Sequence, residues 1–425
     1  MTDTDEREDA TASAPSAPLT DDKQSDDPRA AHLAGQRAFK ELTAPIRGAM
    51  MLARVLGFLY GVLAVAPYVI LVQLGEVLLE AARSGASPDR AEVMTLLMWL
   101  TGAFGLRYGI YFVALTVTHF ADVRFGHIVR SRMVKVLAGA PLAWFTATNS
   151  GAVRKAIQDD THDVHTVIAH APVESAAAVS APASLLIYAF VVDWRLGLLS
   201  IATLPVYALL NAWMMRGMGE KTAQMDRHLT RVSATMVEFV SGIGVVKAFG
   251  RVGRAHSAYL TAADEFSAFY RAWAMPLVTV TCLSFTWVSI PVLLLVNLGG
   301  GALLIHTGAV TLPQVLATTL IALVLPAALI TIASISWSYQ LAGAAALRLC
   351  EVLDTPVLPY PETSQVPQGC TVELDHVTFS YGQPLAVDDV TLTLEPGTVT
   401  ALLGPSGSGK STLATLIARF ADPDS

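Results

Sequence analysis

The sequence predicts a polytopic α-helical membrane domain, with six transmembrane helices and long cytoplasmic extensions, followed by the N-terminal part of an α/β P-loop nucleotide-binding domain. Three observations lead to this fold class. Only 15% of the 425 residues are charged and 53% are hydrophobic, with a mean hydropathy of +0.50, whereas soluble domains carry about 25% charged residues. Six apolar stretches are long enough to cross a bilayer. A glycine-rich segment near the C-terminus lies between a strand-like run and a helix-like run.

Composition divides the chain into a tail at residues 1–35, a membrane domain at 36–353, a linker at 354–369 and a partial nucleotide-binding domain at 370–425. The tail carries nine acidic and three basic side chains, so it holds six of the seven net negative charges. It is rich in Ala, Ser, Pro, Asp and Thr, and we expect it to be disordered and not a signal peptide. The remaining chain is nearly neutral, which argues against nucleic acid as a partner.

The membrane domain begins with an amphipathic, basic stretch at residues 36–50, which predicts a short helix at the cytoplasmic interface. Six spans follow, each near the 20 or so apolar residues that cross about 30 Å of hydrocarbon. We place them at Val55–Leu79, Val93–His119, Val173–Val192, Leu196–Met215, Leu277–Leu304 and Leu312–Ser338.

The connections between the spans are unequal. Those after the first, third and fifth spans are short and carry at most two basic residues, whereas those after the second and fourth are long and basic. The positive-inside bias therefore places the long connections and both termini in the cytoplasm. Both connections keep helical spacing, with interruptions at Gly151 and at Ser241–Gly244. We expect the spans to continue as helices into the cytosol, as a machine that passes force from a soluble domain to a membrane domain requires.

After the proline-rich linker, alternation predicts strands at Cys370–Tyr381 and Ala386–Leu394, followed by a turn at Glu395–Gly397. The run Thr398–Leu403 is short, apolar and β-branched and predicts a buried strand, and Thr412–Arg419 has helical spacing.

Between that strand and that helix, the sequence fits the pattern of Gly, four residues, Gly-Lys and Ser. Glycines allow backbone N–H groups to surround a polyphosphate, and the helix N-terminus adds partial positive charge. Lys410 would reach the β and γ phosphates of ATP, and the Ser411 hydroxyl would bind Mg²⁺. The candidate ATP-binding residues of this loop are Gly404, Pro405, Ser406, Gly407, Ser408, Gly409, Lys410, Ser411 and Thr412.

Arg107 is a charged residue inside the second span, where a charge is expensive. Glu76 and Glu174 are candidate partners. An ion pair, a position near the end of the span and a role in binding cargo all remain open.

The histidines and cysteines do not predict a metal site. Five residues separate His165 from His170, which corresponds to about 500° around a helix, so we expect the two side chains on different faces. The position of His119 in the sequence also does not match the spacing of metal ligands. The cysteines also lack such spacing and are expected to be isolated buried thiols. They are Cys282, Cys350 and Cys370.

Taken together, these segments resemble the ATP-binding cassette (ABC) half-transporters of the exporter-type (type IV) fold. The resemblance extends from Phe39 to Ser425. Besides the phosphate loop, it rests on Trp144-Phe145 with Asn149-Ser150-Gly151, on Ser241–Gly250, on Arg348–Pro356 and on Val377–Tyr381.

The resemblance implies that ATP and Mg²⁺ are the cofactors and that Tyr381 stacks on adenine. It also implies that the regions Asn149–Asp160 and Ser241–Gly250 are coupling helices that dock on nucleotide-binding domains. The partner would be a second half-transporter, identical or different, because ATP is sandwiched between two such domains.

A further likeness concerns the cargo. Gln158–Thr161 with His165 and His170, and Val191–Leu196, resemble the iron-regulated siderophore transporter subunits of actinobacteria, which are associated with uptake. The excess of Arg over Lys also fits a GC-rich bacterial genome. The resemblance implies an ATP-driven transporter half in the bacterial plasma membrane that moves a small molecule such as a siderophore. An exporter of lipids, drugs or peptides is the alternative.

The chain stops at Ser425, before the glutamine loop, the signature motif, the aspartate–glutamate pair and the switch histidine of the resembled family. Phosphoryl transfer needs a positioned water and a completed Mg²⁺ shell. We therefore expect residues 1–425 alone not to hydrolyse ATP, and the chain to be a fragment of a longer product. A truncated, non-hydrolysing subunit that pairs with a complete partner is the alternative. A P-loop kinase on a membrane anchor is disfavoured, because six spans exceed what an anchor needs.

Overall fold

The computed structural model describes residues 28–145, 151, 153–248, 257–359, 363, 366, 369–381 and 385–425. The predictions for residues 1–27, and those that involve Asn149, Ser150, Phe249 and Gly250, lie outside the described residues. Two compact units make up the chain. Unit 1 comprises Met1–Leu52, Thr116–Pro172 and Ile335–Ser425, and unit 2 comprises Ala53–Leu115 and Val173–Ser334.

Six helical segments within the described ranges are long and apolar enough to cross a membrane, which confirms the six predicted spans. Two single, unbroken helices among them have 42 residues or more, which is longer than a bilayer requires. Helix α4 (Arg90–Gly139) has 50 residues and α15 (Leu312–Leu353) has 42. At 1.5 Å per residue they extend about 75 Å and about 63 Å, against about 30 Å of hydrocarbon. The six segments are Ala44–Ser84, Arg90–Gly139, Val153–Val192, Trp194–Met215, Ser257–His306 and Leu312–Leu353.

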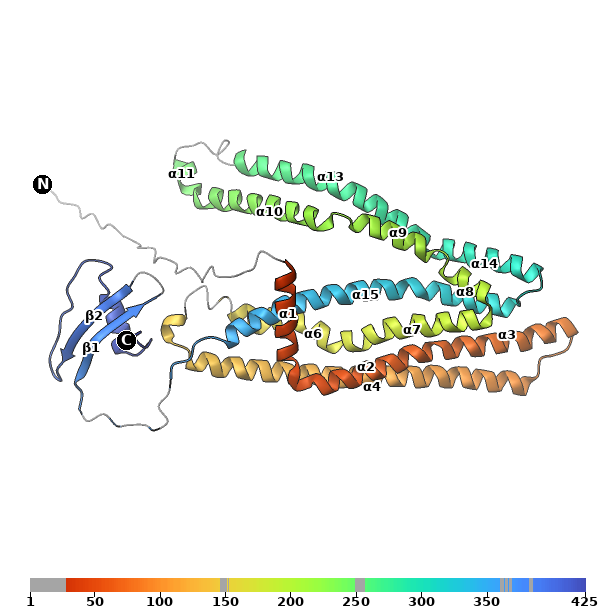
Figure 1. Ribbon diagram of the computed structural model, residues 1–425, viewed down its shortest axis with the longest axis horizontal. Coiled ribbons are helices and arrows are strands. Elements are labelled where there is room, and N and C mark those ends of the chain that lie inside the picture. The colour runs from red at the N-terminus through yellow and green to blue at the C-terminus, as the bar shows by residue number, and fades with distance from the viewer. Residues whose placement is uncertain are drawn as a thin grey trace. The chain divides into compact units, whose positions relative to one another are not determined.

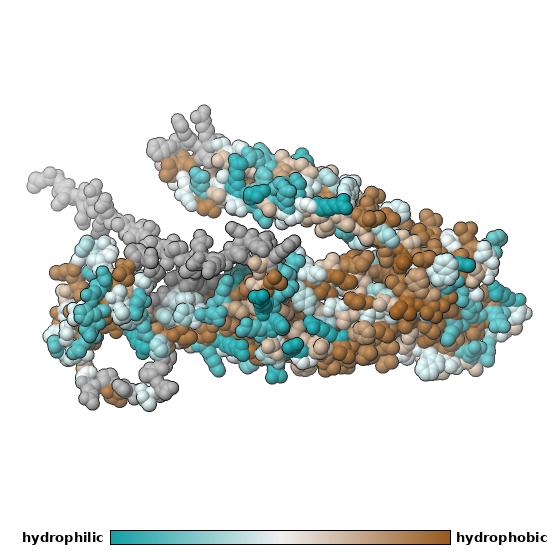
Figure 2. All heavy atoms as spheres, viewed as in Figure 1, coloured by the Kyte–Doolittle hydropathy of each residue, from teal (hydrophilic) through white to brown (hydrophobic). Residues whose placement is uncertain are grey.

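Unit 2 contains most of the apolar helical surface. In Figure 2, hydrophobic side chains gather over α3, α7, α8 and α14. Close packing comes from small residues: a Cβ at Gly57 would lie 2.6 Å from the carbonyl oxygen of Val173, on α7. The elements with residues in this unit, besides parts of α4 and α15, are α2 (Arg47–Val62), η2 (Leu63–Val65), α3 (Ala66–Ser84), α7 (Ala171–Val192), α8 (Trp194–Ile201), α9 (Leu204–Met215), α10 (Met218–Ser241), α11 (Ile243–Ala248), α13 (Ser257–Trp287) and α14 (Ile290–His306).

Within unit 2, α13 lies alongside α9 and α10, so that these helices form a two-layered arm (Figure 1). The predicted interruption is present, because α10 ends at Ser241 and the short helix α11 begins at Ile243. None of the described residues of α10 and α11 is buried.

Unit 1 contains a second helical core around the cytoplasmic parts of α4 and α15. Phe125, Met133 and Leu349 are among its fully buried side chains. Unit 1 also contains the helical elements α1 (Pro28–Leu42), η1 (Ala44–Ile46), η3 (Leu142–Trp144), the π-helical segment η4 (Ala156–Asp160) and α6 (Thr161–Ala169).

Helix α1 differs from the prediction in two respects. It begins at Pro28, so residues 28–35, which we expected to be disordered, are helical. Its apolar side chains Ala38 and Leu42 are buried in the core that includes α15, and a Cβ at Gly35 would lie 2.9 Å from the carbonyl group of Gly343. The apolar face that we assigned to the membrane interface therefore packs on protein.

The nucleotide-binding part of unit 1 is a two-stranded antiparallel sheet with one helix. β1 (Val372–Ser380) pairs with β2 (Leu385–Leu394), and α16 (Lys410–Ile417) follows the glycine-rich loop, as predicted. Leu374, Phe379 and Leu413 are buried in their shared core. The turn after β2 also forms, with the N–H of Thr398 donating to Glu395 O at 3.3 Å.

The strand predicted at Thr398–Leu403 is absent from the structure. Val399 is 99% and Leu403 92% exposed, and the segment has no ladder partner among the described residues. An interior strand needs hydrogen-bonding neighbours on both sides, and β1 and β2 pair with each other instead. Its apolar composition alone therefore does not make it a strand.

The prediction of buried cysteines is wrong. Cys282 and Cys370 are exposed, Cys350 is half-buried, and all three are free thiols. Cys282 lies on α13, in a predicted span, where lipid rather than protein covers an apolar side chain.

Candidate functional site

The glycine-rich loop turns into α16 through two residues in the left-handed region. Gly407 has φ +85° and Gly409 has φ +83°, which a residue with a Cβ adopts only with strain. Gly409 is the N-cap of α16, and a Cβ there would lie 2.2 Å from the carbonyl oxygen of Ala386 on β2. Glycine at position 409 therefore allows the loop to pass directly against the sheet.

Lys410 is the first residue of α16, and its side chain folds back over the loop. Its Nζ donates hydrogen bonds to Gly404 O at 2.9 Å, to Pro405 O at 2.8 Å and to Ser408 Oγ at 3.2 Å. The ammonium group is thus held at the site where the loop's backbone turns. The first N–H groups of α16 have no intrahelical acceptor, as in any α-helix, and they add donors beside it.

A cavity of about 570 Å³ lies between the loop and β2. The cradle of glycines, the ammonium group and the helix N-terminus fit a polyphosphate, and Ser411 follows Lys410 with an exposed side chain that could bind Mg²⁺. The arrangement can bind and orient phosphate groups. The cavity is lined by Leu385, Ala386, Val387, Asp388, Val390, Leu402, Leu403, Gly404, Pro405, Gly407, Ser408, Gly409, Lys410 and Leu413.

Tyr381 follows β1 directly and is exposed. The edge of its ring packs on Phe379, with ring centroids 4.9 Å apart and planes at 87°. Tyr381 is not among the residues that line the cavity, and residues 382–384, which follow it, lie outside the described residues. Its stacking on adenine remains a prediction.

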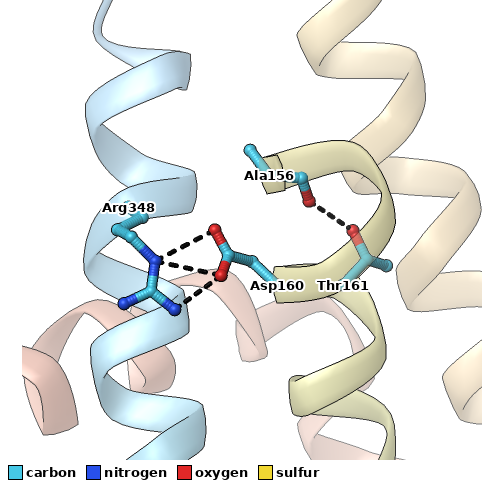
Figure 3. A network of polar contacts seen from close by, with 4 residues as sticks. All are labelled: Ala156, Asp160, Thr161 and Arg348. Carbon is cyan, nitrogen blue, oxygen red and sulfur yellow. Dashed lines mark hydrogen bonds and ion pairs between the residues drawn. The ribbon is translucent and has the colours of Figure 1, made fainter. Parts of the chain in front are cut away.

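A buried ion pair joins the first cytoplasmic connection to the end of α15 (Figure 3). The Asp160 side chain is 1% exposed and that of Arg348 is 36% exposed. Arg348 donates from Nε to Asp160 Oδ1 at 2.9 Å and Oδ2 at 3.1 Å, and from a terminal nitrogen to Oδ1 at 2.5 Å. The hydrogen bond to Asp160 raises the pKa of Arg348 above its ordinary value, although partial burial opposes that shift.

The backbone presents Asp160 through a π-helical turn. The segment η4 ends at Asp160, and Thr161 Oγ1 donates to the carbonyl oxygen of Ala156 at 3.0 Å, five residues earlier (Figure 3). Single π-turns often mark functional positions in α-helices. The sequence analysis named Asp160 and Arg348 in separate segments. It did not predict that they form an ion pair, because 188 residues separate them.

The structure brings together histidines that the sequence analysis placed on different helix faces. The ring centroids of His119 and His165 are 5.9 Å apart, those of His119 and His170 5.3 Å, and those of His165 and His170 5.9 Å. The expectation assumed one continuous helix, whereas α6 ends at Ala169, just before His170. His165 Nδ1 also lies 2.8 Å from Asp122 Oδ2. Across the described residues, no group of three or more His, Cys, Asp and Glu side chains has the arrangement of a metal site.

Arg107 is not paired with Glu76 or Glu174, the two partners considered from the sequence. Among the described residues it has no carboxylate within ion-pair distance, and Glu76 instead accepts a hydrogen bond from Thr311 Oγ1. Arg107 Nε donates to the carbonyl oxygen of Tyr60 at 3.3 Å.

Comparison with known proteins identifies two family regions in the chain. Residues 50–329 match the model of the ABC transporter transmembrane region, and residues 387–425 match the model named ABC transporter. The first region covers the first five predicted spans and part of the sixth, and the second covers the phosphate loop and α16.

The curated relatives are named for a specific transport activity. The chain is 35% identical, over 98% of its length, to the mycobactin import ATP-binding/permease protein IrtA of Mycolicibacterium smegmatis, of which it covers 48%. It is 35% identical, over 91% of its length, to IrtA of Mycobacterium tuberculosis, of which it covers 44%. Identity to IrtB of Mycobacterium tuberculosis, another mycobactin import ATP-binding/permease protein, is 28% over 81% of the chain and 60% of that protein. The chain thus spans about half the length of the IrtA relatives.

Proposed function

Because the chain belongs to the ABC transporter family, we propose that it forms the membrane domain and the start of the ATP-binding domain of one half of an importer for mycobactin-type siderophores. The observation that carries this proposal is the similarity to proteins named for mycobactin import, which extends over 98% of the chain. The half would lie in a bacterial plasma membrane with both termini in the cytoplasm, as the basic cytoplasmic connections indicate.

ATP and Mg²⁺ are the proposed cofactors. Lys410 and the glycine loop would hold the β and γ phosphates, and Ser411 would bind Mg²⁺. Bound Mg-ATP supplies the free energy for transport when its γ-phosphate is hydrolysed. The residues of this chain position the phosphates, because the loop places backbone donors and one ammonium group around a single cavity.

The proposed partner is a second ABC half, and the arm of α10, α11 and α13 supports this. The large apolar side chains Met236, Val237, Val240 and Val245 are exposed on α10 and α11, outside the predicted spans. Exposed apolar surface of this kind in water usually marks a protein interface. A second half would cover it and complete the sandwich around ATP.

The proposal is tested with the full gene product and its partner half in inside-out and right-side-out membrane vesicles. Uptake of radioactive ferric mycobactin should require ATP on the side of the phosphate loop and should disappear in the variant Lys410→Ala. Glu373→Ala serves as the control, because Glu373 is exposed on β1 and neither lines the cavity nor belongs to the phosphate loop.

Two results would refute the proposal. ATP-dependent export of a lipid, drug or peptide without movement of ferric mycobactin would assign the exporter alternative. Uptake that continues unchanged in Lys410→Ala, with that variant present in the membrane, would separate transport from this phosphate loop.

A further inference from the structure

Arg107 lies at the centre of the longest uncharged stretch of α4. It is the only Asp, Glu, Lys or Arg between Glu92 and Asp122, and it is fifteen positions from each of them. At 1.5 Å per residue, about 22 Å of helix lies on either side. An Arg side chain is too short to reach either membrane surface from that depth, so its guanidinium must be satisfied inside the bilayer.

The contacts of Arg107 within unit 2 satisfy only part of the guanidinium. Nε donates to the carbonyl oxygen of Tyr60, and the guanidinium carbon lies 4.5 Å from the centre of the Tyr60 ring and 5.8 Å from that of Tyr108. In the described part of the chain, the terminal nitrogens make no hydrogen bond and no ion pair. Four N–H groups of a charged side chain are therefore available to a group from outside this chain.

Tyr60 lies in the last turn of α2, just before a break in the first span. Helix α2 ends at Val62 and is followed by the 3₁₀ turn η2, directly before Pro67 in α3. The neighbouring carbonyl of Gly61 accepts a hydrogen bond from Ser184 Oγ at 3.3 Å. Side chains from two other helices thus bond to carbonyls at this break, which fixes Arg107 Nε and orients the rest of its guanidinium.

Aromatic rings surround the site on the side that protein does not cover. Tyr108 and Phe104 are exposed and stacked, with centroids 6.4 Å apart, and Tyr60 packs on Tyr111 at 4.8 Å. Arg107 itself is only half-buried. A molecule that approaches from the apolar phase would meet flat aromatic surfaces beside unpaired cationic donors.

We propose that Arg107, with Tyr60 and Tyr108, forms a binding site inside the bilayer for a lipophilic molecule that carries an oxyanion, such as a carboxylate or phenolate oxygen. A guanidinium fork binds such oxygens through two parallel hydrogen bonds, and the low dielectric of the bilayer strengthens them. A neutral apolar molecule would leave the charge unpaired. The inference rests on the proposed function, in that the molecule would be the transported cargo.

The test uses the full gene product with its partner half in lipid nanodiscs. Arg107→Gln and Arg107→Lys are compared with Leu106→Ala, a control that changes the exposed neighbouring residue on the same helix. Two probes are used: ferric mycobactin, and a photoreactive fatty acid whose methyl ester is the neutral counterpart. Affinity is measured by titration, and crosslinks are located by mass spectrometry.

Loss of a charge-assisted hydrogen bond should weaken binding of the fatty acid and of ferric mycobactin by about 10-fold to 100-fold in Arg107→Gln. Arg107→Lys should retain part of the affinity, Leu106→Ala should bind as the wild type does, and the methyl ester should not distinguish the variants. The thermal stability of the ligand-free protein should stay equal or rise in Arg107→Gln, because a charge that lacks a full set of partners is removed from the membrane.

Three outcomes are decisive. Equal binding of both probes to the wild type and Arg107→Gln overturns the inference. A fall in ligand-free stability, or loss of the association between the two halves, in Arg107→Gln also overturns it and assigns Arg107 a structural role. Arg107-dependent capture of the fatty acid without any binding of ferric mycobactin to the wild type supports the site and refutes the proposed cargo.

Discussion

The buried pair of Asp160 and Arg348 allows a quantitative prediction. In Arg348→Met, the Asp160 carboxylate, 1% exposed, would lose all three of its hydrogen bonds from the guanidinium. Breaking a buried pair from one side costs about 3–5 kcal/mol, because an uncompensated buried charge remains. Asp160→Asn should cost less, about 1–3 kcal/mol, because the partly exposed Arg348 can be hydrated.

Hydrogen exchange in the segment around Asp160 gives a local measure of this free-energy cost. Hydrogen exchange measured by mass spectrometry on the peptide 153–169 reports opening of η4 and α6. Since 1.4 kcal/mol is a factor of ten, Arg348→Met should lower protection there by roughly a hundred-fold to a few thousand-fold. Asp160→Asn should lower it about 5-fold to 150-fold. The double variant should recover part of the loss, because no unpaired charge remains.

The exposed pair of Arg231 and Glu265 provides a matched control. It joins α10 to α13, and its side chains are 57% and 43% exposed. Arg231→Met should therefore cost at most about 1 kcal/mol. The reasoning is refuted if Arg348→Met changes exchange no more than Arg231→Met does, or if Asp160→Asn is the more damaging of the two single changes.

Three further predictions concern the nucleotide-binding part. Gly409→Ala should abolish binding of a fluorescent ATP analogue, because the new Cβ would lie 2.2 Å from Ala386 O. Gly407→Ala has open space at its Cβ, so it should weaken binding only through the strain of its positive φ. Equal losses of binding in the two variants would contradict this prediction. The hydrogen bond and charge of Asp389 raise the pKa of His376 above 6.5, so the pair should stabilise the hairpin below about pH 6.5 and lose that effect as pH rises through the folded-state pKa. An NMR titration should show the His376 pKa falling in Asp389→Asn, and an unchanged pKa would count against the pair. Purified residues 1–425 should show no Mg²⁺-dependent ATP turnover. Measurable turnover would contradict the expectation that phosphoryl transfer needs a positioned water and a completed Mg²⁺ shell that these residues do not provide.

The membrane spans and the phosphate loop were predictable because their signals are local. A bilayer requires about 20 apolar residues in a row, and a polyphosphate requires glycines and a lysine at fixed spacing. The two strands of the hairpin were also predictable from alternation, although their antiparallel pairing was not predicted. The strand at Thr398–Leu403 was not, because a strand depends on neighbours that its own residues do not encode.

The residues that the sequence analysis left unpaired depend on long-range geometry. Asp160 and Arg348 are far apart in the chain, and His170 joins His165 and His119 only because α6 ends before it. The partner of Arg107 was sought among carboxylates, but the structure provides a backbone carbonyl that is available where the first span breaks. In each case the deciding feature is a helix irregularity or a packing contact. Neither has a local sequence signal as strong as that of a membrane span or a phosphate loop.

The position of the ion pair constrains how force can pass through unit 1. Asp160 ends the segment that resembles a coupling helix, and Arg348 lies five residues before the end of α15, which leads into the nucleotide-binding part. Opening a buried bidentate pair costs several times the thermal energy of about 0.6 kcal/mol, so the two segments should move as one body. Displacement during a transport cycle would then fall on segments outside this pair. The pair would thus hold the two segments together as one rigid unit. Arg348→Met should therefore uncouple ATP hydrolysis from transport, even where ATP hydrolysis and transport are each still measurable.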